Sequence, residues 1–258
     1  WSLLNVVLMY TTFAHLGSRT AMRYQIPQLK GNQLSEVKQT VLLATFGINL
    51  FIALLIIGYA LLWAAPGEQT IGWIVLAIVI VLNCVYEHSI SELKGYQQFI
   101  LVSRATYVRY TLNFVFTAGF IYYWGFNGAM AALLLGVLLS LFYLQRQYPL
   151  TLPRQLNTTT LRSLVKTGAP IMALDLATLA LKSIDKLLIA AFLGAQSLGY
   201  YAIGSMLIGP LMNVPGASRE VTEQVLMGQH RSLTIRQQLN HYLFEPLRFN
   251  AYSMPILI

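Results

Sequence analysis

Long apolar stretches alternate with short polar ones along almost the whole chain. Each apolar stretch approaches or reaches the length of roughly 20 residues that a helix needs to cross a bilayer. Two of them, Val41–Leu62 and Ile71–Tyr86, contain no charged residue at all. The pattern predicts an all-α, polytopic transmembrane helical bundle of eight segments: Trp1–Leu16, Val41–Trp63, Ile71–Tyr86, Phe99–Trp124, Gly128–Leu144, Leu164–Leu193, Gly199–Val214 and Tyr242–Ile258. Because the chain starts at Trp1 and stops inside an apolar run, we expect it to be an internal piece of a longer protein with truncated end segments.

Composition supports a membrane protein. Only 10% of the 258 residues are charged and 56% are hydrophobic, and the mean hydropathy is +0.59. A soluble domain usually carries about a quarter charged residues, so this chain has too little charge for a water-facing surface. The single cysteine, Cys84, lies inside an apolar run, where we interpret it as a packing residue.

The net charge of +8 is distributed unevenly among the connections. Every odd-numbered connection carries Lys or Arg, from Arg19 and Arg23 in the first to Arg231 and Arg236 in the seventh. The even-numbered connections, near residues 64–70, 125–127 and 194–197, carry none. Because cytoplasmic loops hold the excess of Lys and Arg, the first connection and every second one after it should be cytoplasmic.

A basic, proline-containing linker, Gln145–Leu161, separates five segments from three. We therefore expect five helices over residues 1–145, a cytoplasmic linker over 146–162 and a second group of three helices over 163–258. Two cytoplasmic stretches, Thr160–Lys166 and Arg231–His241, fit either helices lying on the membrane face or ordinary solvated linkers.

The sixth segment is the least apolar, since it contains Asp175, Lys182, Asp185 and Lys186. Charges at membrane depth normally face a protein interior or a water-filled cavity. At about 100° per residue, positions 175, 182 and 186 share one helix face, and Asp185 is three residues from Lys182. This stripe indicates either a substrate or ion pathway or an internal ion-pair network. The pathway is favoured because Lys182 and Lys186 together outnumber their nearest acidic partner, Asp185.

Arg104 and Arg109 near the start of the fourth segment have two interpretations as well. They either snorkel to the inner interface or line a vestibule open to the cytoplasm. The chain has no phosphate loop, paired-cysteine metal spacing, HExxH or GxSxG motif. We therefore expect neither enzymatic activity nor a metal or organic cofactor.

Several stretches resemble the bacterial polysaccharide (O-antigen or exopolysaccharide) flippases. The resemblance rests on Ile184-Asp185-Lys186, Leu193-Gly194 and Leu198-Gly199-Tyr200-Tyr201, in the order seen around the seventh helix of that family. Leu16-Gly17 with Ala21 and Arg23, the Gly-x-Pro at Gly168–Pro170, and Lys94-Gly95-Tyr96-Gln97 add further matches. The family belongs to the superfamily of multidrug and toxic-compound extruders.

The resemblance implies a two-lobed transporter fold, of which this chain holds the second to ninth helices, working by alternating access in the bacterial inner membrane. Its implied substrate is a polyprenyl-pyrophosphate-linked oligosaccharide, and H⁺ or Na⁺ is the candidate ion for coupling its transport. Its partners would be the bilayer, the lipid-linked glycan and glycan-assembly proteins, without nucleic acid. Basic side chains would attract the pyrophosphate, and the candidates are Lys182, Lys186, Arg23, Arg104 and Arg109. Asp175 and Asp185 would position these basic side chains or bind a coupling cation.

Three other functions remain open. A drug or cation extruder should place acidic residues in its cavity, a membrane glycan polymerase or ligase should have a large outer loop, and a scaffold would bind a partner without transport.

Overall fold

The computed structural model describes residues 2–64, 67–150, 156–194, 197, 200 and 201. The chain divides into two compact units, residues 1–172 and 173–258, which are treated separately below. Helix α6, Thr158–Phe192, contributes its first half to unit 1 and its second half to unit 2. The predicted segment Tyr242–Ile258 and all but two residues of Gly199–Val214 lie outside the described residues, as does the stretch Arg231–His241.

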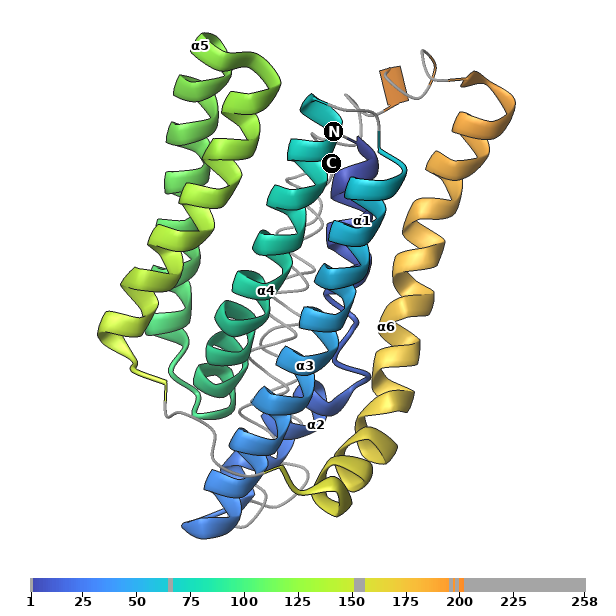
Figure 1. Cartoon of the computed structure of the whole chain (residues 1–258). Helices are drawn as coiled ribbons and strands as arrows, with labels where there is room; N and C mark the ends of the chain where they lie inside the picture. Colours follow the sequence, from blue (N-terminus) through green and yellow to red (C-terminus); the bar gives the residue numbers. More distant parts are fainter. Residues whose placement is uncertain (1, 65–66, 151–155, 195–196, 198–199, 202–258) are drawn as a thin grey trace, which may run out of the picture. The chain divides into compact units, whose positions relative to one another are not determined.

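The described residues are helical and include no β-strand. Unit 1 contains α1 (Ser2–Thr11), α2 (Ser18–Gln25), a 3₁₀ turn (Ile26–Gln28), α3 (Asn32–Leu62), α4 (Glu68–Gly95), α5 (Phe99–Gln147) and the start of α6 (Figure 1). Within the described part, four helices are long and apolar enough to cross a membrane: α3, α4, α5 and residues 158–181 of α6. The protein is therefore a helical membrane protein, as the hydropathy pattern predicts.

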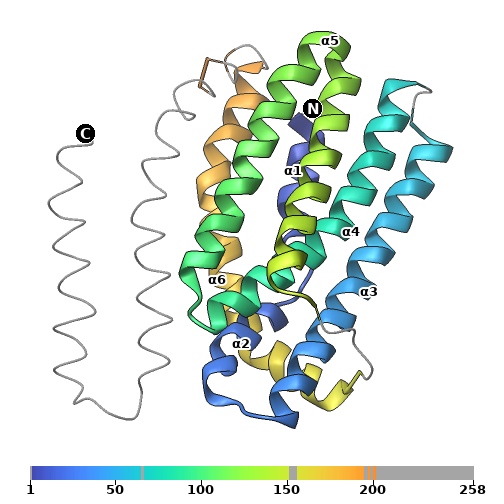
Figure 2. The ribbon, with the colours of Figure 1, turned by 90° about the vertical axis from the view of Figure 1, so that its left-hand side faces the viewer.

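Helix α5 contains two antiparallel arms (Figures 1 and 2). The helical backbone breaks at Gly125, where φ is 54° and ψ is −126°. These angles suit glycine, because a side chain is strained at positive φ. The reversal confirms the two predicted segments that meet at residues 125–127.

The second arm of α5 packs through small residues. A Cβ atom added to Gly128 would collide with the backbone carbonyl of Phe120, and one added to Gly136 would collide with the side-chain amide of Asn113. Both partners belong to the first arm, so the arms approach at contact distance through these glycines. Such close approach through small residues is typical of helix–helix contacts in membranes.

Two helices extend further than hydropathy predicts. α3 begins at Asn32 rather than near Val41, and α4 ends at Gly95 rather than near Tyr86. The added turns carry charged residues, including Lys38, Glu87 and Glu92, which an apolar-run criterion assigns to connections. These charges form ion pairs within unit 1, so they are compatible with helical segments packed against other helices.

Helix α4 is the central helix of unit 1, since it packs against α1, α2, α3 and α5. Its second half joins α5 in an apolar cluster that includes Ile90, Leu93, Val102 and Leu144. A second cluster connects α2, α3 and α6 through Met22, Val41 and Leu164.

The first turns of α6 belong to that second cluster. The Asn157 side-chain oxygen accepts hydrogen bonds from the backbone amides of Thr159 at 3.0 Å and Thr160 at 3.3 Å, which caps the helix. The Asn157 amide donates to Glu36 on α3 at 2.7 Å. Thr160–Lys166 is therefore neither a separate interfacial helix nor a linker: it is the beginning of α6.

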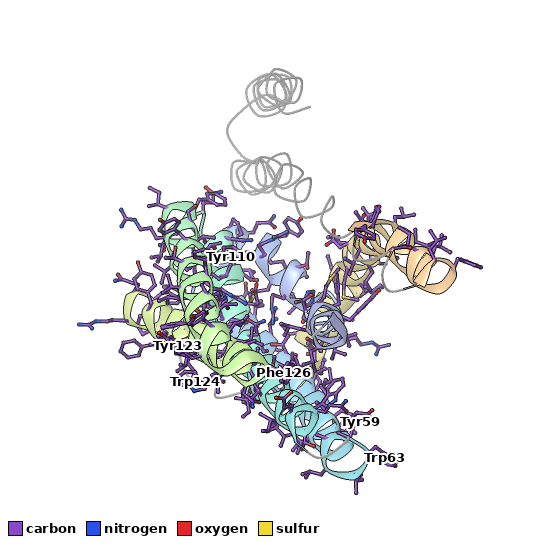
Figure 3. The ribbon with its side chains drawn as sticks, turned by 90° about the horizontal axis from the view of Figure 1, so that it is seen from above. Tyr59, Trp63, Tyr110, Tyr123, Trp124 and Phe126 are labelled. Atoms are coloured by element: carbon purple, nitrogen blue, oxygen red, sulfur yellow. The ribbon has the colours of Figure 1, made fainter. Side chains whose placement is uncertain are left out.

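The two ends of unit 1 differ in chemistry. The connections after α1, α4 and α5, predicted to be cytoplasmic, lie at one end, and the α3–α4 connection and the α5 reversal lie at the other (Figure 1). This second end exposes aromatic rings, among them Tyr59, Trp63, Tyr123 and Trp124, which Figure 3 shows around its edge. Aromatic rings collect at membrane–water interfaces, so the aromatic end fits the interface opposite the basic end.

Candidate functional site

A polar stripe runs along the second half of α4. Asn83, Glu87, Ser91 and Lys94 follow one another at intervals of three or four residues, which places them on one helix face. Asn83 lies within the apolar run Ile71–Tyr86 and the other three residues follow it, so a hydropathy plot does not reveal this stripe. Because α4 is central in unit 1, its polar face is turned toward other helices, where it requires polar partners.

Helix α2 supplies the opposing charges. It begins after Leu16 and Gly17, whose φ angles of 49° and 81° are both left-handed. A Cβ atom on Gly17 would collide with the backbone of Gly168 in α6, so glycine is required there for packing as well as for conformation. The resulting tight turn directs α2 across α4 and brings Arg19 and Arg23, one helical turn apart, to the polar stripe.

A cleft of about 200 Å³ lies between these elements. Three cationic side chains line it, Arg19, Arg23 and Lys94, against a single carboxylate among its described lining residues, Glu87. Its remaining lining residues are neutral or titratable: Thr12, Phe13, His15, Thr20 and Ser91. The cleft has polar walls and an excess of positive charge, as an anion-binding site requires.

Arg19 is the most deeply placed cation, with 8% of its surface exposed. Its Nη2 donates to the backbone oxygen of Cys84 at 3.4 Å and approaches the Cys84 sulfur at 3.7 Å. Within the described residues, Arg19 forms no ion pair and its Nε has no hydrogen-bond partner. A buried guanidinium without a carboxylate is costly, so an anion in the cleft would gain more from Arg19 than from a solvated, paired arginine.

Arg109 reaches the same region from α5. Its guanidinium donates to Glu87 at 3.1 Å and to Asn83 at 2.7 Å, and it lies 4.5 Å from the ring centroid of Tyr86. All three partners are on α4. Arg109 is therefore held as part of an α4–α5 clamp, and its positive charge is partly neutralised.

A second polar cluster lies closer to the end of unit 1 that carries the connections after α4 and α5. Glu92, 2% exposed, accepts from Tyr148 at 2.9 Å, pairs with Lys38 at 3.3 Å and contacts His88 at 3.1 Å. These partners come from α3, from α4 and from the residue that follows α5. Burial and then the neighbouring Glu92 carboxylate raise the pKa of the Tyr148 hydroxyl above its ordinary value. The cluster ties three helices together at the base of the bundle.

The candidate residues named from sequence are placed as follows. Arg23 lines the cleft, Arg109 contacts one of its lining residues, and Arg104 is exposed on α5 and does not line it. Asp175, Lys182, Asp185 and Lys186 all lie on the second half of α6, in unit 2. Asp175 is exposed, and the side chains of the other three lie outside the described residues, so the predicted stripe stays a prediction.

Arg19, Lys94 and Glu87 were missed as site residues by reasoning from sequence. The available signal was the i, i+4 spacing of Arg19 and Arg23 directly after an apolar segment, together with the spacing of Glu87 and Lys94 after another. Neither spacing reveals that the two segments face each other. No group of three potential metal-ligating His, Cys, Asp or Glu side chains occurs among the described residues.

Comparison with models of protein families places the chain in a known family. Residues 2–227 match a family described as polysaccharide biosynthesis protein. The chain belongs to this polysaccharide biosynthesis family. The matched region spans unit 1 and much of unit 2, so it contains both the residues that line the cleft and the charged half of α6. Searches of curated proteins and of solved structures find no match. A helical membrane protein of this family fits a role in moving polysaccharide precursors.

Proposed function

We propose that this protein is a membrane transporter that flips a polyprenyl-pyrophosphate-linked oligosaccharide from the cytoplasmic to the outer leaflet of the bacterial inner membrane. The observation that carries the proposal is the cationic cleft of unit 1. It combines Arg19, which lacks a carboxylate partner among the described residues, with Arg23 and Lys94 at one end of the transmembrane bundle. This end carries the connections expected to be cytoplasmic, where such a substrate is loaded.

The physical reason is the cost of moving an anion through a membrane. A pyrophosphate loses water as it enters the protein, and that loss must be compensated by donors that carry positive charge. Arginine suits this task because its planar guanidinium binds two phosphate oxygens at once. The inner position of Arg19 and the outer positions of Arg23 and Lys94 would let the phosphate exchange water for donors in steps.

The positive charge of the residues that line the cleft argues against export of cationic drugs. Among the described lining residues, a cation would meet three positive side chains and one carboxylate, and that carboxylate is already paired with Arg109. The remaining features of the proposal rest on the family resemblance: alternating access between two lobes, transport rather than catalysis, and coupling to H⁺ or Na⁺. Within the second half of α6, Lys182 and Lys186 would attract the anionic head group, with Asp175 and Asp185 positioning them or binding a coupling cation.

The experiment tests the cleft in the full-length protein. Purified protein in liposomes is supplied with a fluorescent polyprenyl-pyrophosphate-linked oligosaccharide, and movement between leaflets is measured by accessibility to an impermeant quencher. Arg19→Gln should reduce the flipping rate by at least 10-fold, roughly the effect of removing one charged hydrogen-bonding partner. Arg146→Gln is the matched control, since Arg146 is exposed at the end of α5 and does not line the cleft.

The control variant should retain the wild-type rate. Equal rates for Arg19→Gln and wild type, with both proteins folded, would refute the proposal that the cleft binds the substrate. Transport of a cationic dye but not of the lipid-linked glycan would support the extruder instead.

A further inference from the structure

Glu87 has an unusual position for an acidic side chain. It lines the cationic cleft, and it also lines a smaller inner cavity of about 20 Å³ that shares Thr12 and Arg19 with the cleft. Its side chain is 37% exposed, so part of it faces open space rather than packed atoms. An anion that approaches Arg19 through the cleft therefore also approaches Glu87.

The orientation of Glu87 is set from α5. Arg109 donates to its Oε1 at 3.1 Å, while Asn83 and the Tyr86 ring hold the same guanidinium in place. Asn83 and Tyr86 are 8% and 3% exposed, so the anchor of this clamp is buried. The carboxylate is thereby kept beside the cleft instead of rotating away into solvent.

The electrostatic consequence follows from the charges that surround Glu87. Arg19 and Arg23 face it from α2, Lys94 from its own helix, Arg109 from α5, and His15 from the turn before α2. In the absence of a ligand, the carboxylate offsets part of this positive charge. When an anion enters, it gains the attraction of the cations but is repelled by the carboxylate, which Arg109 prevents from moving far.

We propose that Glu87 is an internal counter-ion of the cationic cleft, which weakens anion binding enough for the anion to leave again. This inference rests on the proposed function, because it assumes that the cleft binds the phosphate part of a substrate. A transporter needs a site that attracts its substrate but also releases it, and binding that is too tight stops turnover. Arg19 would supply the attraction, and Glu87 would limit it.

The test uses inorganic pyrophosphate as the probe, titrated into the full-length protein in detergent and followed by isothermal calorimetry. Glu87→Gln keeps the size and hydrogen-bonding capacity of the side chain but removes its charge. Pyrophosphate should bind this variant on the order of 5-fold more tightly than wild type at low salt, with a smaller difference at high salt because the repulsion is screened. In the liposome assay, the same variant should flip substrate more slowly in spite of tighter binding.

Glu68→Gln is the matched control, because Glu68 is an exposed residue at the opposite end of the same helix. It removes the same charge without changing the cleft, so it should leave the pyrophosphate affinity unchanged. If Glu87→Gln is unstable because Arg109 has lost its partner, Glu87→Gln/Arg109→Gln removes both charges of the pair. This double variant should still bind at least as tightly as wild type.

The outcomes separate the two proposals. Unchanged or weaker binding in Glu87→Gln, or weaker binding in the double variant, while Arg19→Gln loses binding, would overturn the counter-ion role and leave the cleft as the anion site. An equal gain in Glu68→Gln would also overturn it, since the effect would then be one of net charge. Binding that Arg19→Gln does not alter would instead refute the anion site itself.

Discussion

Replacing Glu92 with glutamine removes the charge at the centre of the polar cluster that joins α3, α4 and the end of α5. Lys38 would lose its carboxylate partner at 3.3 Å while its side chain stays 15% exposed. Breaking a fully buried ion pair from one side costs about 3–5 kcal/mol. Glutamine can still accept from Tyr148, and Lys38 reaches some solvent, so we expect a loss of about 2–3 kcal/mol.

This loss can be measured as a change in thermal midpoint of the purified protein in detergent. For a chain of this size, each kcal/mol corresponds to about 2–4 °C, so Glu92→Gln should lower Tm by about 4–12 °C. Glu68→Gln removes a charge from the same helix at an exposed position and should change Tm by less than about 2 °C. The comparison separates the buried ion pair from a general effect of charge.

A double-mutant cycle tests the cause. Lys38→Met removes the stranded cation, so Lys38→Met/Glu92→Gln should be more stable than the sum of the single effects predicts, by about 1 kcal/mol or more. Additive effects, or a Glu92→Gln variant as stable as Glu68→Gln, would refute the view that the Lys38–Glu92 pair fastens the base of the bundle.

Two further predictions concern α5 and the residue that follows it. Gly128→Ala should destabilise the protein by about 1–3 kcal/mol, because the added methyl group meets the Phe120 backbone. Gly119→Ala in the same helix meets no atom within 4 Å and should be neutral or slightly stabilising, so equal Tm values for the two variants would contradict the packing of the arms. Because the pKa of Tyr148 is raised in the folded protein, the unfolded chain loses this proton first as pH rises, and stability should fall above about pH 10. Tyr148→Phe should reduce this alkaline loss in Tm-against-pH curves, and an unchanged slope would show that the Tyr148 hydroxyl is not its source.

Sequence reasoning was most successful where the bilayer imposes a simple rule. Apolar runs located α3, α4, both arms of α5 and α6, and the reversal at Gly125 was expected from a short uncharged connection. The bilayer requires a helix with an apolar exterior, and a continuous run of apolar residues in the sequence is enough to identify such a helix. The alternation of basic and neutral connections agrees with the placement of those connections at opposite ends of unit 1.

The same reasoning failed at the helix ends. Lys38 and Glu92 lie on different helices, 54 positions apart in the sequence. Because their side chains form an ion pair, both charges can lie on helices that are packed in the bundle. A hydropathy criterion evaluates each charge as if it were alone, so it ended α4 near Tyr86 and began α3 near Val41. The short helix α2 was also missed, because its basic residues suggested a solvated loop.

Sequence by itself determined that this protein is a helical membrane protein with basic and uncharged connections in alternation, and its residues carry the resemblance that the family match supports. The tertiary structure alone decided which charges meet. Arg19 and Lys94 are separated by 75 positions but line one cleft, because α2 turns back across the central helix after Gly17. Local composition sets whether a segment prefers lipid or water, whereas the formation of a binding site depends on long-range packing, and that packing placed the candidate anion site on α2 and α4.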